Sequence, residues 1–279
     1  MSSEVNHWRR LMLWWLVTSV IGTLVVVFLL APGLPPGNGT VEASGQVVDN
    51  TVLLGVATPV ALGVVVFFIY AMLNFREREP GTLLDGPAIR GDARIQIWWL
   101  VASAALVLFL AGYGTIRMLV DGAGGGQGPA PIGAPSLSSP PLQVQVIAQQ
   151  WKFTYRWPAY GGVETPNLVL PANRTVEFHV TSLDVIHSFW AYQLGVKADA
   201  NPGIDNIAYV TTKSPMSFHV ECAELCGVWH GYMFGTGHVE RQADFASWIA
   251  QQQRQYAPVT KSLPPYALKY FPDPTRRGG

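Results

Sequence analysis

Cysteine and charge are both scarce in this chain. Of its 279 residues only two are cysteines, and charged side chains make up 13% of the sequence against 49% hydrophobic residues. The sequence contains no Cys-x-x-Cys-His motif, which excludes a fused domain with covalently attached c-type haem. So few charges cannot cover the surface of a soluble protein of this size, and we therefore expect part of the chain to lie in lipid.

Three long apolar runs, at 11–31, 52–75 and 97–116, contain no Asp, Glu, Lys, Arg or His. Each reaches the roughly 20 residues that a helix needs to cross a bilayer. We predict a transmembrane hairpin over 36–120, preceded by a hydrophobic segment, 1–35, that is either a signal-anchor or a signal peptide. The first run exceeds the usual apolar core of a signal peptide, about 7 to 15 residues, and no clear cleavage site follows it, which favours its retention as a third helix.

Arginine placement predicts the orientation of these helices. The segment between the second and third runs carries Arg76, Arg78, Arg90 and Arg94, whereas residues 32–50 contain neither Lys nor Arg. Arginine-rich loops face the cytoplasm. We therefore expect a multi-pass protein of a bacterial plasma (inner) membrane, with everything after the third helix on the outer, periplasmic side.

The composition changes after the third run. A Gly/Pro-rich linker, 121–141, is followed by short runs in which apolar and polar residues alternate between turn signals, over 142–240. This pattern predicts an all-β domain, an antiparallel sandwich or small barrel. A tail, 241–279, contains a short helix, expected at 242–256. The predicted strands lie at 142–148, 151–156, 175–180, 206–212 and 216–221.

The same alternation separates the histidines expected at the surface of this domain from those that are candidates for a functional site. His179 and His219 fall on the polar faces of their predicted strands, so we expect both imidazoles to be solvated. His187 and His230 are left as candidates for a functional site.

Both cysteines lie in CAELCGVWHGYM (222–233), together with His230 and Met233. A disulfide between Cys222 and Cys226 would suit an oxidising compartment, but it would close a very small loop and leave the other two side chains unexplained. Zinc held by both thiolates, His230 and a second histidine has no use for a thioether. Thiolate, imidazole and Met together favour copper, and two thiolates suit a pair of coppers better than a mononuclear site with a single Cys.

At these residues the sequence resembles subunit II of haem-copper cytochrome c oxidases. C-x-E-x-C-x3-H-x2-M resembles the signature of the dinuclear copper A centre, HSFWAYQLGVKADANPG (187–203) is similar to the segment that supplies the second histidine, and the aromatic run QQWKFTYRW (149–157) also matches. The resemblance implies N-terminal transmembrane α-helices followed by an all-β, cupredoxin-like Greek-key sandwich. It extends from the membrane hairpin to about residue 240.

The resemblance also implies a function. The protein would be the subunit of a respiratory oxidase that accepts electrons from cytochrome c at two copper ions and passes them to haem in subunit I, where oxygen is reduced to water. Its partners would be subunit I with haem and copper B, subunit III, cytochrome c and the lipid membrane, and no nucleic acid. The implied roles are bridging thiolates for Cys222 and Cys226, terminal ligands for His187 and His230, a weak axial ligand for Met233, a carbonyl ligand for Glu224 and the electron-accepting aromatic residue for Trp151.

The resemblance further implies that the Glu224 side chain reaches a Mg or Mn ion at the boundary with subunit I. Trp151 could also be an ordinary core residue of the sandwich, because aromatic neighbours surround it in the sequence. Two positions depart from the family. Ile204 stands where an arginine follows Pro-Gly, and no glutamate precedes Trp98, which puts proton uptake by that route in doubt. A membrane-tethered copper carrier or sensor, and a disulfide-stapled assembly module, remain as alternatives.

Overall fold

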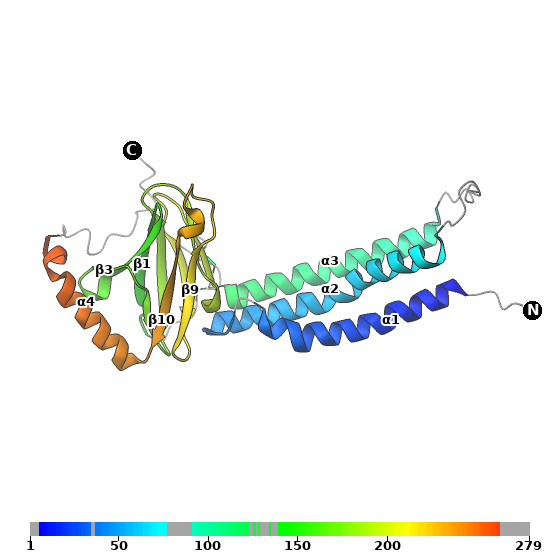
Figure 1. Cartoon of the computed structure of the whole chain (residues 1–279), viewed down its shortest axis with the longest axis horizontal. Helices are drawn as coiled ribbons and strands as arrows, with labels where there is room; N and C mark the ends of the chain where they lie inside the picture. The colour runs from blue at the N-terminus through cyan, green and yellow to red at the C-terminus, as the bar shows by residue number, and fades with distance from the viewer. Residues whose placement is uncertain are drawn as a thin grey trace, which may run out of the picture. The chain divides into compact units, whose positions relative to one another are not determined.

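The computed structural model describes two compact units (Figure 1). One comprises Met1–Leu34 and Val48–Thr115, and the other Pro35–Val47 and Ile116–Gly279. The residues that the structure describes are 6–34, 37–76, 91–122, 125–126, 128, 134 and 139–262.

The first unit contains most of the residues of three long apolar helices. These are α1 (His7–Val25), which continues through wider and then tighter helical turns to Gly33, α2 (Val41–Asn74) and α3 (Ala93–Asp121). All three are long and apolar enough to cross a membrane, as predicted. Each helix begins before its predicted run. Arg78 and Arg90 of the predicted cytoplasmic loop lie outside the described residues.

Specific contacts join α1 to α2. The indole Nε1 of Trp15 donates a hydrogen bond of 2.8 Å to the carbonyl oxygen of Pro59, and His7 Nδ1 lies 2.9 Å from the hydroxyl of Tyr70. A Cβ at Gly63 would lie only 3.2 Å from the Trp15 Nε1, so glycine permits this close approach. The first apolar run therefore packs on α2.

The second unit is a sandwich of two five-stranded sheets, as the resemblance implied (Figure 1). The prediction of an antiparallel sandwich was wrong at two places, because β1 runs parallel to β5 and β10 runs parallel to β4. One sheet has the order β3 (Val163–Thr165), β2 (Lys152–Trp157), β1 (Leu142–Gln149), β5 (Thr175–Ser182), β8 (Asn206–Thr211). The other has the order β4 (Val169–Pro171), β10 (Phe234–Glu240), β9 (Met216–Cys222), β6 (His187–Ala191), β7 (Val196–Ala200).

Strand β5 departs from simple alternation. Its apolar residues, such as Phe178, are fully buried between the sheets as predicted. The opposite face is not wet, however, and the prediction that His179 is solvated was wrong, because this side chain is only 6% exposed. Its ring nitrogens lie 2.8 Å from a carboxylate oxygen of Asp205 and 3.5 Å from one of Glu177. Two carboxylates thus compensate the desolvation of this imidazole. His219, on β9, is exposed as predicted.

The C-terminal helix α4 (Gln242–Ser262) belongs to the same packed body. Phe245 and Ile249 are 3% and 2% exposed, and the ring of Phe245 lies 5.8 Å from that of the fully buried Trp157. The predicted short helix at 242–256 is thus confirmed and runs further, to Ser262, while residues 263–279 lie outside the described part of the chain.

Two segments outside the predicted β domain also contact the sandwich. Thr40 is fully buried, and its hydroxyl donates to the carbonyl of Leu194 at 2.7 Å. The backbone N–H of Gly126, within the predicted linker, donates to the carbonyl of Lys197 at 3.0 Å. The packed unit is therefore larger than the strand pattern alone indicates.

Candidate metal centre

Adjacent strands bring the first two predicted ligands together. His187 begins β6 and Cys222 ends β9, and these strands pair antiparallel with Phe189 opposite Cys222. Because side chains on one face of a strand recur every second residue, His187 and Phe189 share a face, which directs the imidazole toward Cys222.

The remaining predicted ligands lie in the loop between β9 and β10. The N–H of Cys222 donates to the carbonyl of Met233 at 3.0 Å, which closes this loop at its base. A single tight helical turn, His230–Tyr232, returns the chain to β10. Gly227 has a φ of +115°, a conformation that favours glycine. The residues between β9 and β10 therefore form a compact loop that folds back over the two cysteines.

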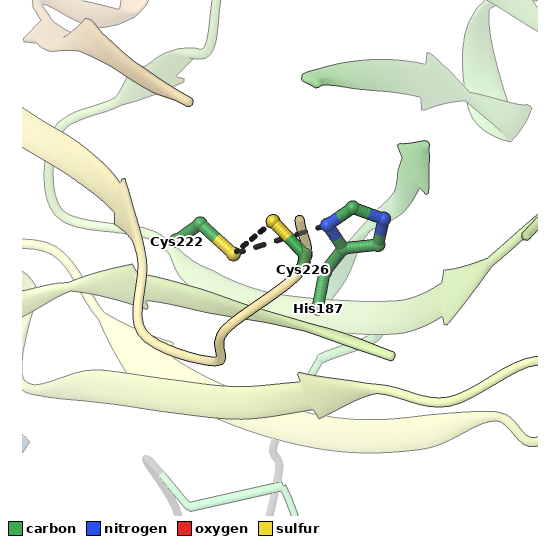
Figure 2. A group of neighbouring side chains, drawn as sticks. All are labelled: His187, Cys222 and Cys226. Atoms are coloured by element: carbon green, nitrogen blue, oxygen red, sulfur yellow. Dashed lines mark hydrogen bonds between the residues drawn. The ribbon is translucent and has the colours of Figure 1, made fainter. Parts of the chain in front are cut away.

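The two cysteine thiols face each other (Figure 2). Their Sγ atoms are 3.7 Å apart and both cysteines are free, whereas a disulfide would need about 2.05 Å. Nδ1 of His187 lies 3.9 Å from Cys222 Sγ, and the ligand atoms of His187, Cys222 and Cys226 all lie within 4.8 Å of one another. The disulfide alternative does not match this arrangement.

The other two predicted side chains complete the cluster on the side of Cys226. Its Sγ lies 3.6 Å from Nδ1 of His230 and 3.9 Å from Sδ of Met233. Two thiols, two imidazoles and one thioether therefore gather at one place. This set of donors fits a soft metal and is compatible with copper, because zinc sites do not use a thioether.

The sulfur atoms of the cluster are shielded from water. Cys222, Cys226 and Met233 are 8%, 4% and 2% exposed. Burial, the hydrogen bond with Cys222 and repulsion by the negative charge of a Cys222 thiolate raise the pKa of Cys226 to about 12. Its thiol is therefore protonated at neutral pH, and a bound metal cation would displace that proton.

Glu224 and Trp151 also lie beside the cluster. The carbonyl oxygen of Glu224 is 3.2 Å from Cys222 Sγ, while its side chain is exposed. Trp151 lies in the turn between β1 and β2, is half-buried against the sandwich core, and donates through Nε1 to the carbonyl oxygen of Cys226 at 3.2 Å. The alternative of a simple core tryptophan does not account for this direct bond to the loop.

Two residues that sequence reasoning missed support the cluster. Asp184 has a carboxylate oxygen 2.9 Å from Nε2 of His187, and Gln150 donates through its side chain to the carbonyl of Cys226 at 2.9 Å. Burial raises the pKa of Asp184, but hydrogen bonds from the Gln150 N–H and from His187 outweigh it and lower this pKa overall. The only sequence signal was proximity, since Asp184 precedes His187 by three residues and Gln150 precedes Trp151.

Comparison with known proteins shows similarity to one family. Residues 162–236 match the family model described as cytochrome c oxidase subunit II, periplasmic domain. The chain is 28% identical to cytochrome c oxidase subunit 2 of Synechocystis sp. (84% of this chain, 81% of the relative) and 28% identical to that of Thermostichus vulcanus (90% and 89%). The subunit 2 of Bacillus subtilis is 26% identical (92% and 72%).

A solved structure, the periplasmic domain of cytochrome oxidase subunit II from Bradyrhizobium japonicum, matches 41% of this chain and 95% of its own, with 29% identity and a TM-score of 0.40. The matches in sequence extend over both the apolar helices and the domain that carries the donor cluster. The family model and these relatives are all described as cytochrome c oxidase subunit II, and this chain is therefore similar to that subunit.

Proposed function

We propose that this protein is the electron-accepting subunit of a respiratory cytochrome c oxidase. It would take electrons from cytochrome c at a dinuclear copper A centre and deliver them to haem in subunit I, where oxygen is reduced to water. When bound, such a centre supplies one-electron redox chemistry. Cys222 and Cys226 would hold both coppers, with His187, His230, Met233 and the carbonyl of Glu224 as the remaining ligands.

One observation carries this proposal. Two free, buried thiols lie 3.7 Å apart, with one imidazole Nδ1 within 4 Å of each sulfur. A mononuclear copper site needs one thiolate, so the second thiol would have no partner in it. The arrangement has instead a pseudo-symmetric form, in which each half contributes one sulfur and one nitrogen.

The protein side chains would supply a dry and rigid cage. His187 is completely buried and lies on a strand that is paired on both sides. Cys222 ends a strand and is tied to Met233 by a backbone hydrogen bond. Ligands held on paired strands move little, and a cage that moves little keeps the reorganisation on electron transfer small.

Exposed apolar side chains in the two ligand loops support contact with a partner protein. Large exposed apolar patches mark interaction sites on soluble surfaces. The domain also contains eight acidic and five basic residues over 142–240, a charge that favours a basic cytochrome c as donor. The exposed residues are Leu183, Val185, Ile186, Leu225, Val228, Trp229, Tyr232 and Phe234.

Three further assignments are part of the proposal. The exposed Glu224 side chain would bind Mg or Mn at the boundary with subunit I, because carboxylate oxygens suit these ions. Subunit III would be a further partner. The three helices would place the protein in a bacterial plasma membrane, with the sandwich on the periplasmic side, as the arginine distribution predicts.

Electron paramagnetic resonance of the copper-loaded full chain in detergent tests the proposal. We expect two coppers per chain and a hyperfine pattern from one unpaired electron shared by both. Cys222→Ser and Cys226→Ser should each abolish the shared pattern, because each removes a bridging sulfur. His219→Gln is a matched control, since it replaces an exposed imidazole on β9 and should leave the spectrum unchanged.

A signal from one isolated copper in the wild-type chain would contradict the dinuclear proposal and favour a copper carrier. The partner assignment has its own measurement. Affinity purification of the full chain from the native membrane should recover a haem-containing subunit, and recovery of this chain without haem would contradict its place in an electron relay.

A further inference from the structure

A continuous hydrogen-bonded path links two proposed copper ligands through residues outside the proposed ligand set. Oδ1 of Asp184 lies 2.9 Å from Nε2 of His187, and Oδ2 accepts from the backbone N–H of Gln150 at 2.7 Å. Gln150 in turn donates through Nε2 to the carbonyl of Cys226 at 2.9 Å. The path thus joins β6 to the ligand loop by way of the turn between β1 and β2.

The Asp184 carboxylate is itself held in place. Besides Gln150, the backbone N–H of Val185 donates to Oδ1 at 2.7 Å, and the Ser182 hydroxyl lies 3.3 Å from the same oxygen. A carboxylate with several donors keeps its charge and its orientation. It therefore presents a fixed acceptor to the imidazole of His187, which is fully buried.

This contact determines which ring nitrogen can bind a metal. A neutral imidazole has one N–H and one lone pair, and a carboxylate at Nε2 selects the form with the proton on Nε2. The lone pair then lies on Nδ1, the atom that faces Cys222 Sγ at 3.9 Å. Without the carboxylate, either nitrogen could carry the proton.

We infer that Asp184 is a positioning residue that fixes the tautomer of His187 and tunes the copper centre through it. Only the tuning of the copper centre rests on the proposed function, whereas the tautomer of His187 does not. A negative charge behind one terminal ligand strengthens that ligand and stabilises the more oxidised state of a bound centre. Removing the charge should therefore raise the reduction potential.

Asp184→Asn tests the inference because it keeps the shape of the side chain and removes its charge. In the full chain without copper, nitrogen NMR of the histidine rings should show the Nε2–H form of His187 in the wild type. The variant should show a mixture or the Nδ1–H form, because the Asn amide can donate to Nε2. The matched control is Asp199→Asn, an exposed carboxylate on β7 that should change neither readout.

With copper bound, Asp184→Asn should weaken copper binding by about 10- to 100-fold, the usual effect of losing such a partner, and raise the reduction potential. Circular dichroism establishes that the variant is folded. If it is not, Asp184→Ala is measured in the same way, because it removes the carboxylate without introducing an amide donor.

An unchanged His187 tautomer together with an unchanged potential in the folded variant would overturn the inference. This result is distinguishable from failure of the proposed function. If the wild-type chain binds no copper pair, the proposed function fails, while the tautomer measurement on the copper-free chain still decides the role of Asp184.

Discussion

The indole Nε1 of Trp151 donates a hydrogen bond to the carbonyl oxygen of Cys226 across 3.2 Å. This bond connects the aromatic residue proposed to receive electrons directly to a residue proposed to hold copper. Trp151 also lines a cavity of about 510 Å³ together with Met233 and Phe234, so one side of the indole lies beside open space.

Trp151→Phe should retain an aromatic ring but lose this hydrogen bond. Because Gln150 still donates to the same carbonyl, we expect only a small loss in the free energy of unfolding, about 0.5–1.5 kcal/mol, and an unchanged copper spectrum. Electron uptake from a reduced cytochrome c should become slower, as measured by stopped-flow absorbance. An unchanged rate would contradict the role of Trp151, and Trp190→Phe, on β6, provides the comparison.

Gly227→Ala should destabilise the ligand loop. Gly227 has a φ of +115°, and a Cβ there would lie 3.1 Å from Nε2 of Gln150 and 3.3 Å from the indole of Trp151. The backbone strain alone is worth about 1–3 kcal/mol. Thermal unfolding should show this loss, whereas Gly231→Ala in the same loop, where a Cβ meets no atom within 4 Å, should cost far less. Equal effects of the two substitutions would refute the argument.

The His179 cluster predicts a loss of stability at alkaline pH. Burial lowers the pKa of His179, but hydrogen bonds and charges of Asp205 and Glu177 outweigh it and raise the pKa to about 9. Since this folded-state pKa lies above the unfolded value of about 6.5, the ion pairs stabilise the fold fully below pH 6.5 or so, and this contribution disappears as the pH rises to about 9.

Melting temperatures of the wild type and His179→Gln, measured between pH 6 and pH 9.5, check this prediction. The wild type should be more stable than the variant at pH 6, and the difference should shrink as the pH rises. His219→Gln serves as the control because His219 is exposed. A difference that grows with pH would show that His179 is neutral in the folded protein.

Phe245→Ala should release α4 from the sandwich. Phe245 is 3% exposed and packs on Trp157, which is fully buried. Replacing a buried Phe by Ala typically costs about 3–5 kcal/mol. Chemical denaturation should show a loss of this size, while Ser247→Ala on the exposed side of the same helix should be nearly neutral. A neutral Phe245→Ala would mean that the helix does not contribute to the fold.

The packing of α1 on α2 leads us to expect that α1 is retained in the mature protein. Trp15 donates a hydrogen bond to the carbonyl of Pro59, and His7 lies within hydrogen-bond distance of the Tyr70 hydroxyl. Cleavage of the first segment would remove both contacts from α2. We expect intact-mass measurement of the chain purified from membranes to include residues 7–33. A mature chain beginning after Ala31 would contradict this prediction. Trp15→Phe, which removes the bond to Pro59, should weaken the helix pair by about 0.6 kcal/mol.

Local patterns in the sequence were sufficient for much of this structure. The length of the apolar runs determined the three helices, because a membrane helix must satisfy its backbone hydrogen bonds within its own segment. Alternation determined strands such as β1 and β9. The spacing of Cys222, Cys226, His230 and Met233 within one loop made their convergence predictable, since residues this close in sequence remain close in space.

Only the tertiary structure decided the features that depend on distant residues. His179 occupies a polar position of its strand, yet Asp205 and Glu177 allow it to be buried. The parallel pairing of β1 with β5 results from strand order, which alternation does not encode. The path from Asp184 through Gln150 to Cys226 joins three separate segments of the chain. Such contacts depend on how the sheets pack, and no local pattern specifies them.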